Sequence, residues 1–149
     1  MAPALLPPFE LSITSGELAV REALGRFIAA LSPISLEVEE TGTVELVMAE
    51  VLNNIVEHAY PDATKPGPID IRCAHKADGL HVSITDAGLA MPDGKLPLGE
   101  PVSVDVALDD LPEGGFGWFL IQDLAKDVHY ARNSHQNRLT MRLPVGMTG

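Results

Sequence analysis

The stretch of residues 43–60 constrains the fold of this chain more than any other part of the sequence. Apolar residues recur there at steps of three or four, the spacing of one face of an α-helix: Val44, Met48, Val51, Ile55 and Ala59. Pro61 follows, and proline ends a helix because it lacks a backbone N–H and clashes with the preceding turn. The sequence therefore predicts a long amphipathic helix over residues 43–60.

Strict alternation of apolar and polar residues predicts short strands on both sides of this helix. The alternating groups are residues 9–13, 69–73, 80–84, 128–130 and 139–143. The pair Asp78-Gly79 between the second and third groups is a hairpin signal, with a connection slightly longer than two residues. A turn over residues 134–137 joins the last two groups.

Two further helices complete the expected order of elements. Thr14 and Glu17 form a capping-box pattern that opens a helix ending near Pro33. Residues 117–126 form another helix, and the acidic residues 35–42 form either a helical lead-in or a loop. This order predicts an α+β fold, an α/β sandwich in which helices pack on one face of a mixed, mostly antiparallel sheet.

A chain of 149 residues corresponds to one domain, which we place at residues 9–145, between tails at 1–8 and 146–149. Residues 86–115 are irregular, with four prolines and several glycines, and a short helix is expected near residues 102–108. Long irregular segments inside compact domains are often lids. We therefore expect a lid at about residues 89–116.

Composition excludes several classes of partner. The formal net charge is -11, and an acidic surface repels phosphodiester backbones, so no nucleic-acid partner is expected. Cys73 is the single cysteine, so no intramolecular disulfide can form. No apolar run approaches the ~20 residues of a membrane span, and the first eight residues lack a basic signal-peptide region. A cytoplasmic protein is expected.

The first candidate for chemistry is Glu50-x-x-x-Asn54 on the long helix. At ~100° per residue, these two side chains lie one turn apart beside the apolar face. An amide oxygen suits magnesium, which takes few protein ligands, and a shielded carboxylate can deprotonate an attacking hydroxyl. A solvated helix face is the alternative explanation for the same pattern.

Two glycine-containing segments are the other candidates. Asp86-Ala87-Gly88 follows a strand, where a carboxylate can accept a hydrogen bond from an exocyclic amine such as that of adenine; a plain turn is the alternative. The segment from Gly115 to Gly117 opens a helix, so its backbone N–H groups could bind an anion, or it could serve as a lid hinge. Neither the Rossmann nor the Walker-A spacing is present.

The order of these three motifs resembles the GHKL superfamily, which contains DNA gyrase, histidine kinases and a heat-shock chaperone. Residues 49–60 look like the N-box of one branch, the anti-sigma-factor serine kinases. Residues 115–121 look like the second glycine box of that branch, and residues 137–141 like its final strand. The resemblance covers about residues 9–145.

This resemblance implies a domain that binds ATP and Mg²⁺ between the long helix and the lid. It implies Glu50 as the general base, Asn54 as the magnesium ligand and Asp86 as the adenine acceptor. Gly88 would let the base approach, and Thr140 would support the adenine side. Gly115 and Gly117 would wrap the phosphates.

The resemblance also implies the partners. Members of this branch phosphorylate a serine on an anti-anti-sigma (STAS-type) protein and sequester a sigma factor, often as a homodimer. Two departures favour an alternative, a nucleotide-gated binding module with weak or no catalysis. Ala90 stands where the first glycine box has a second glycine, and the lid carries six acids and one base, which gives -5 and no arginine to clamp a phosphate.

Overall fold

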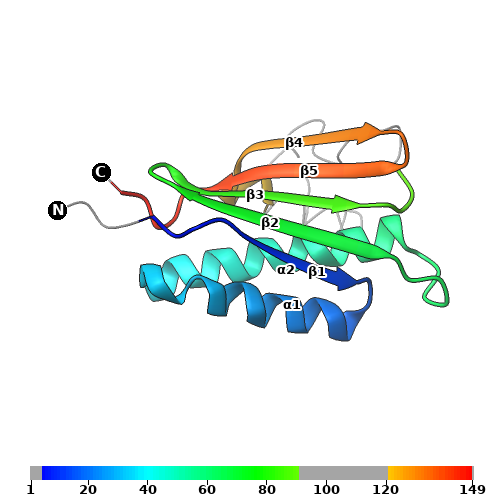
Figure 1. Cartoon of the computed structure of the whole chain (residues 1–149), viewed down its shortest axis with the longest axis horizontal. Coiled ribbons are helices and arrows are strands. Elements are labelled where there is room, and N and C mark those ends of the chain that lie inside the picture. The colour runs from blue at the N-terminus through cyan, green and yellow to red at the C-terminus, as the bar shows by residue number, and fades with distance from the viewer. Residues whose placement is uncertain (1–4, 91–120, 149) are drawn as a thin grey trace, which may run out of the picture.

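The computed structural model describes residues 5–90 and 121–148. Within them, two long helices cover one face of a five-stranded sheet (Figure 1). This arrangement confirms the predicted α+β class. The elements in chain order are β1 (Phe9–Thr14), α1 (Glu17–Ala30), the 3-10 helix η1 (Ser32–Ile34), α2 (Val38–Ala59), β2 (Pro68–Lys76), β3 (Gly79–Asp86), β4 (Lys126–Asn133) and β5 (Gln136–Leu143).

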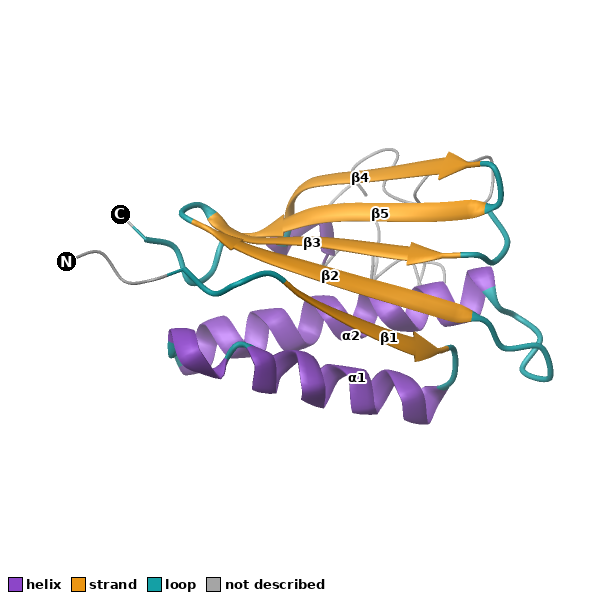
Figure 2. Cartoon of the chain, in the orientation of Figure 1, coloured by secondary structure: helices purple, strands orange, loops and turns teal. Residues whose placement is uncertain are grey.

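The sheet has the strand order β1-β2-β3-β5-β4 (Figure 2). Every pairing among these five strands is antiparallel. A mixed, mostly antiparallel sheet was predicted, and the described residues contain no parallel pair. β1 and β2 are neighbours although both long helices separate them in sequence. The helices therefore cross one face of the sheet between two adjacent strands.

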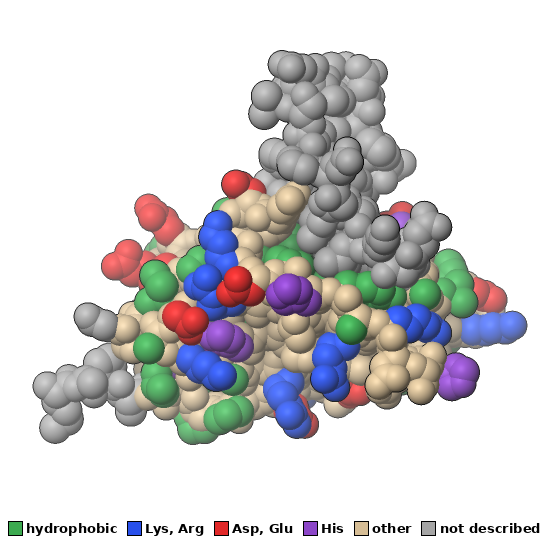
Figure 3. All heavy atoms as spheres, turned by 90° about the horizontal axis from the view of Figure 1, so that it is seen from above, with side chains coloured by type: hydrophobic (Ala, Val, Ile, Leu, Met, Phe, Trp, Pro, Cys, Tyr) green, Lys and Arg blue, Asp and Glu red, His purple; other side chains and the backbone are tan. Residues whose placement is uncertain are grey.

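The two-residue period of the strands gives the sheet an inner and an open face. Leu80, Val82, Ile84 and Asp86 of β3 are buried on the inner face, which the helices cover. The residues between them point to the open face, which is polar: Figure 3 shows Lys, Arg and His side chains spread over the surface of the strands. A functional side chain on a strand is thus assigned to a face by its parity.

Helix α2 begins five residues earlier than the apolar pattern indicated, at Val38. The side chain of Glu40 accepts a hydrogen bond from the backbone N–H of Glu37, at 3.2 Å. This back-bond closes the first turn of the helix. Of residues 35–42, left open between helix and loop, residues 38–42 belong to α2 and Glu37 is its N-cap, while residues 35–36 precede the helix.

Helix α1 has the predicted extent, but its predicted capping box is wrong. Gly16 occupies the N-cap position, and no side chain caps the helix there. Thr14 cannot cap it because it is the last residue of β1 and pairs with Pro68 of β2. Ser15 instead exchanges hydrogen bonds with Gly67, through its backbone N–H and its hydroxyl.

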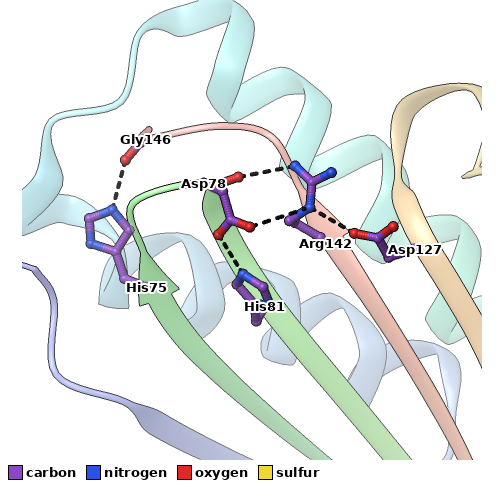
Figure 4. A network of polar contacts seen from close by, with 6 residues as sticks. All are labelled: His75, Asp78, His81, Asp127, Arg142 and Gly146. Atoms are coloured by element: carbon purple, nitrogen blue, oxygen red, sulfur yellow. Dashed lines mark hydrogen bonds and ion pairs between the residues drawn. The ribbon is translucent and has the colours of Figure 1, made fainter. Parts of the chain in front are cut away.

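The β2–β3 hairpin is tighter than predicted. Lys76 pairs directly with Gly79, so only residues 77–78 form the connection. Gly79 has a φ of 126°, a value that side chains disfavour. Beside the hairpin, Arg142 of β5 reaches both Asp78 and Asp127 (Figure 4).

His75 connects both ends of the described chain to the sheet. Its Nδ1 accepts a hydrogen bond from the Leu6 backbone at 3.0 Å, and its Nε2 lies 2.7 Å from the carbonyl oxygen of Gly146 (Figure 4). One ring nitrogen accepts and the other donates, which fits the neutral imidazole. Gly146 also donates its N–H to the carboxylate of Glu40, at 2.8 Å.

Residues 121–124 are helical and β4 begins at Lys126, so the helix predicted over residues 117–126 ends earlier than expected. Its start, the short helix near residues 102–108 and most of the predicted lid lie outside the described residues. Within residues 5–90 and 121–148, neither helix is both long and apolar enough to cross a bilayer.

Replacing Gly79 with alanine tests the tight hairpin. A Cβ at this position would overlap with the carbonyl oxygen of Leu143, so we expect Gly79→Ala to lower the free energy of unfolding by about 2 kcal/mol. Gly25→Ala on α1 is the control, because a Cβ at this position meets nothing within 4 Å. This substitution should raise the free energy of unfolding by about 0.5–1 kcal/mol. Urea unfolding that leaves Gly79→Ala as stable as wild type contradicts this explanation.

Candidate nucleotide site

The C-terminal half of α2 carries the predicted pair Glu50 and Asn54. Asn54 is only 4% exposed, between the buried residues Val51 and Ile55. Its Nδ2 donates to the backbone carbonyl of Glu50 at 2.7 Å. Its Oδ1 is buried and has no hydrogen-bond partner among the described residues.

An unpartnered buried oxygen is costly, on the order of 1–3 kcal/mol. The cost is removed when a ligand or cation binds the oxygen, and a neutral amide oxygen is a suitable ligand for magnesium. No group of three or more His, Cys, Asp or Glu side chains in residues 5–90 and 121–148 is placed to hold a metal. Magnesium does not need such a group, because it keeps water and phosphate oxygens as most of its ligands. Asn54 thus fits a magnesium complex of a nucleotide.

Asp86 ends β3 on the inner face and is only 5% exposed. Its Oδ1 accepts two hydrogen bonds, from the Gly88 backbone at 2.9 Å and from Nδ2 of Asn137 at 2.7 Å. Burial raises the pKa of this carboxyl above its usual value, and these bonds and the charge of Arg132 oppose the shift. No hydrogen bond within the described residues engages Oδ2, which leaves this oxygen to accept from a ligand.

Hydrogen bonds of the backbone and of the Tyr60 hydroxyl bring the end of β3 to the end of α2. Leu89 donates its N–H to the carbonyl of Ala59 at 2.9 Å. The Tyr60 hydroxyl donates to the carbonyl of Pro68 at 2.6 Å and accepts from the Ala87 backbone at 2.8 Å. Asp86 therefore lies at the same end of the molecule as Asn54, which precedes Ala59 by five residues on α2.

Gly88 has a packing role that the sequence did not indicate. A Cβ there would overlap with the backbone of Ala59, so glycine permits the close approach of the strand end to the helix. Its predicted role, letting an adenine approach, stays a prediction.

Thr140 is not brought to this site. It lies in the middle of β5, where it pairs with Ser83 and His129, and its parity differs from that of the buried residues Leu139 and Met141. Its side chain therefore belongs to the open face, opposite to Asp86. The open face has its own polar hollow of about 600 Å³, lined by Ser83, Thr85 and Arg138 among others. Gly115 and Gly117 lie outside the described residues.

Asn137 is the residue of this site that the motif analysis missed. It is 3% exposed on β5 and pairs in register with Asp86. The signal was available, because counting back by two from the apolar Leu139 places Asn137 on the inner face. Asn137 was predicted as the last residue of a turn over residues 134–137 and, through the resemblance, as the first residue of the final strand, but its side chain was given no role.

The chain is similar in sequence to a known family and to named proteins. A family model described as histidine kinase-like ATPase domain matches residues 13–143. Serine-protein kinase RsbW of Bacillus licheniformis is 28% identical over 100 residues, covering 66% of this chain and 62% of the relative. Its namesake in Bacillus subtilis is 30% identical over 97 residues, covering 64% and 60%. This chain thus spans about three fifths of the length of these relatives.

A solved structure supports the same fold. The crystal structure of the RsbU and RsbW domains of a Mycobacterium tuberculosis protein aligns with a TM-score of 0.64 at 16% identity, covering 96% of this chain and 33% of that one. The resemblance to the serine kinase branch that the motifs indicated is confirmed by the named relatives.

Replacing Asp86 with asparagine tests the cost of its burial. The pKa of this carboxyl is raised in the folded protein. Its protonation therefore contributes fully to the free energy of unfolding below the unfolded pKa, and this contribution is lost as the pH rises through the folded pKa. We therefore expect Asp86→Asn to unfold at higher urea than wild type at pH 7, with the difference closing toward pH 4.

The exposed Asp123→Asn is the control for loss of one negative charge. The explanation is contradicted when Asp86→Asn is less stable than wild type at pH 7, or when the difference between the two proteins grows as the pH falls.

Proposed function

The chain belongs to the histidine kinase-like ATPase domain family, and on that premise we propose that it is an ATP-dependent protein serine kinase. We propose that it phosphorylates a serine of an anti-anti-sigma, STAS-type partner and sequesters a sigma factor. The observation that carries this proposal is the buried oxygen of Asn54, which has no hydrogen-bond partner in residues 5–90 and 121–148. It lies one turn after Glu50 and at the same end of the molecule as Asp86.

Each residue has a role that its surroundings support. Asn54 Oδ1 would hold magnesium, which when bound neutralises phosphate charge. Asp86 would accept a hydrogen bond from the 6-amine of adenine through Oδ2, since its Oδ1 already has two donors. Gly115 and Gly117 would contribute phosphate-binding backbone N–H groups, as the resemblance implies.

Glu50 is the proposed general base. Its side chain is half-buried on α2 and makes no hydrogen bond or ion pair with the other described residues. It would accept the proton of the attacking serine hydroxyl while the serine oxygen bonds to the γ-phosphorus and the bond from that phosphorus to the β-bridging oxygen breaks. The products are phosphoserine, ADP and a protonated Glu50 that returns its proton to water. The homodimer expected from the resemblance stays a prediction.

Transfer of labelled phosphate tests the kinase. With Mg-ATP and an anti-anti-sigma protein that binds the chain, we expect label on a partner serine. Glu50→Gln should lower the transfer rate by about a hundredfold or more, because it removes the base but keeps its shape. Glu57→Gln, an exposed position on the same helix, is the matched control. A partner that binds but never acquires label from wild type rejects the kinase and favours the binding module.

Replacing Asn54 with leucine tests the magnesium role separately. Leucine fills the same space without a buried unpaired oxygen, so the folded protein should be at least as stable as wild type. The gain in ATP affinity on adding Mg²⁺ should fall by about tenfold or more. Calorimetric titrations with ATP, with and without Mg²⁺, measure this, and Asn53→Ala, exposed beside it, is the control. An unchanged dependence on Mg²⁺ in Asn54→Leu excludes Asn54 as the ligand.

A further inference from the structure

We propose that Arg132 on the edge strand β4 and Asn137 on β5 are positioning residues that fix the carboxylate of Asp86, and thereby set the selectivity of the site for adenine. This inference rests on the proposed function, because it takes Asp86 as the acceptor of the adenine amine. It adds residues that lie outside the three motifs of the sequence.

The amide of Asn137 has only one orientation that satisfies its neighbours. Its Nδ2 donates to Asp86 Oδ1 at 2.7 Å and to the carbonyl of Leu89 at 2.9 Å. Its Oδ1 accepts from the Tyr130 hydroxyl at 2.6 Å and from Nη1 of Arg132 at 2.8 Å. Turning the amide over would set its oxygen against a carboxylate and a carbonyl, and its nitrogen against the Arg132 guanidinium, which cannot accept a hydrogen bond. The donors on β4 therefore hold the amide toward Asp86.

Arg132 joins this amide to the backbone beyond Asp86. The same Nη1 atom also donates to the carbonyl of Gly88, at 2.9 Å. Gly88 in turn donates its N–H to Asp86 Oδ1. Nη1 of Arg132, on the exposed edge strand, thus hydrogen-bonds both groups that donate to the Asp86 carboxylate: the Asn137 amide and the Gly88 peptide backbone.

This bracing occupies one oxygen of Asp86 and leaves the other in a fixed direction. A fixed acceptor distinguishes an adenine from a base with oxygen in place of the 6-amine, because two acceptors would then face each other. When the bracing is removed, the carboxylate can turn, and the penalty for the wrong base falls. Changes at Arg132 and Asn137 should therefore alter the ratio of affinities for nucleotides with a 6-amine and a 6-oxygen base more than they alter the affinity for the diphosphate group itself.

The test compares ADP with inosine diphosphate, whose base carries a 6-oxygen, by calorimetric titration of the full chain. We expect Arg132→Gln to lower the preference for ADP by about three- to tenfold, and Asn137→Leu to lower it at least as much. Arg132→Lys should recover much of the loss, because a single ammonium nitrogen can make both contacts that Nη1 makes.

Arg138→Gln is the matched control. Arg138 follows Asn137 directly but lies on the open face and makes no hydrogen bond to the described residues of the site, so its variant should keep the wild-type preference. A wild type that does not prefer ADP, or an Asp86→Asn variant that keeps the preference, overturns the adenine role of Asp86 and this inference with it. A preference that is lost in Asp86→Asn but unchanged in Arg132→Gln overturns only the positioning role. Arg132 is exposed, so this variant decides the question even when Asn137→Leu does not fold.

Discussion

The backbone hydrogen bond from Leu89 to Ala59, at 2.9 Å, is the constraint on which the rest of the site depends. It joins the residues after β3 to the last turn of α2, and Tyr60 strengthens the junction by bridging Pro68 and Ala87. Only a glycine at position 88 permits this approach. This junction holds the carboxylate of Asp86 on β3 and the amide of Asn54 on α2 at the same end of the molecule.

Two groups at that end are unfavourable for the folded chain by itself. Asn54 keeps in the core an oxygen that no other described residue hydrogen-bonds, and Asp86 keeps a carboxylate at which burial raises the pKa. Most of the surrounding core is apolar and tightly buried. Local costs of this kind, in an otherwise consistent structure, are expected where a protein binds a ligand. A magnesium nucleotide is one ligand that can satisfy both, because its cation can bind the amide oxygen and its adenine amine can donate to the carboxylate.

The sequence predicts the framework of this fold because helices and strands have different periods. The apolar face of α2 and the alternation in β2, β3 and β5 fix which side chains reach the core. Thr14 does not cap α1 because it is the last residue of β1 and pairs in the sheet. This tertiary contact cannot be read from a local sequence pattern. The start of α2 was left open because its first turn holds two glutamates and the exposed Val38, none of which continues the buried apolar face.

The site was predictable to the extent that its residues belong to motifs. Asn54 and Asp86 were identified in this way, and the resemblance supplied their roles. Asn137 and Arg132 were missed because their importance comes from strand register. Asn137 of β5 pairs with Asp86 of β3, and Arg132 of β4 pairs with Asn137. Thr140 was selected from the resemblance alone, and strand parity places it on the other face of the sheet.

The central claim is that Asn54 and Asp86 contact one nucleotide, and a crystal structure with Mg-ADP tests it most directly. The account predicts Asn54 Oδ1 at about 2.1 Å from magnesium and Asp86 Oδ2 within about 3.2 Å of the 6-amine of adenine. A nucleotide bound on the open face of the sheet, or one whose magnesium has no contact with Asn54, contradicts it.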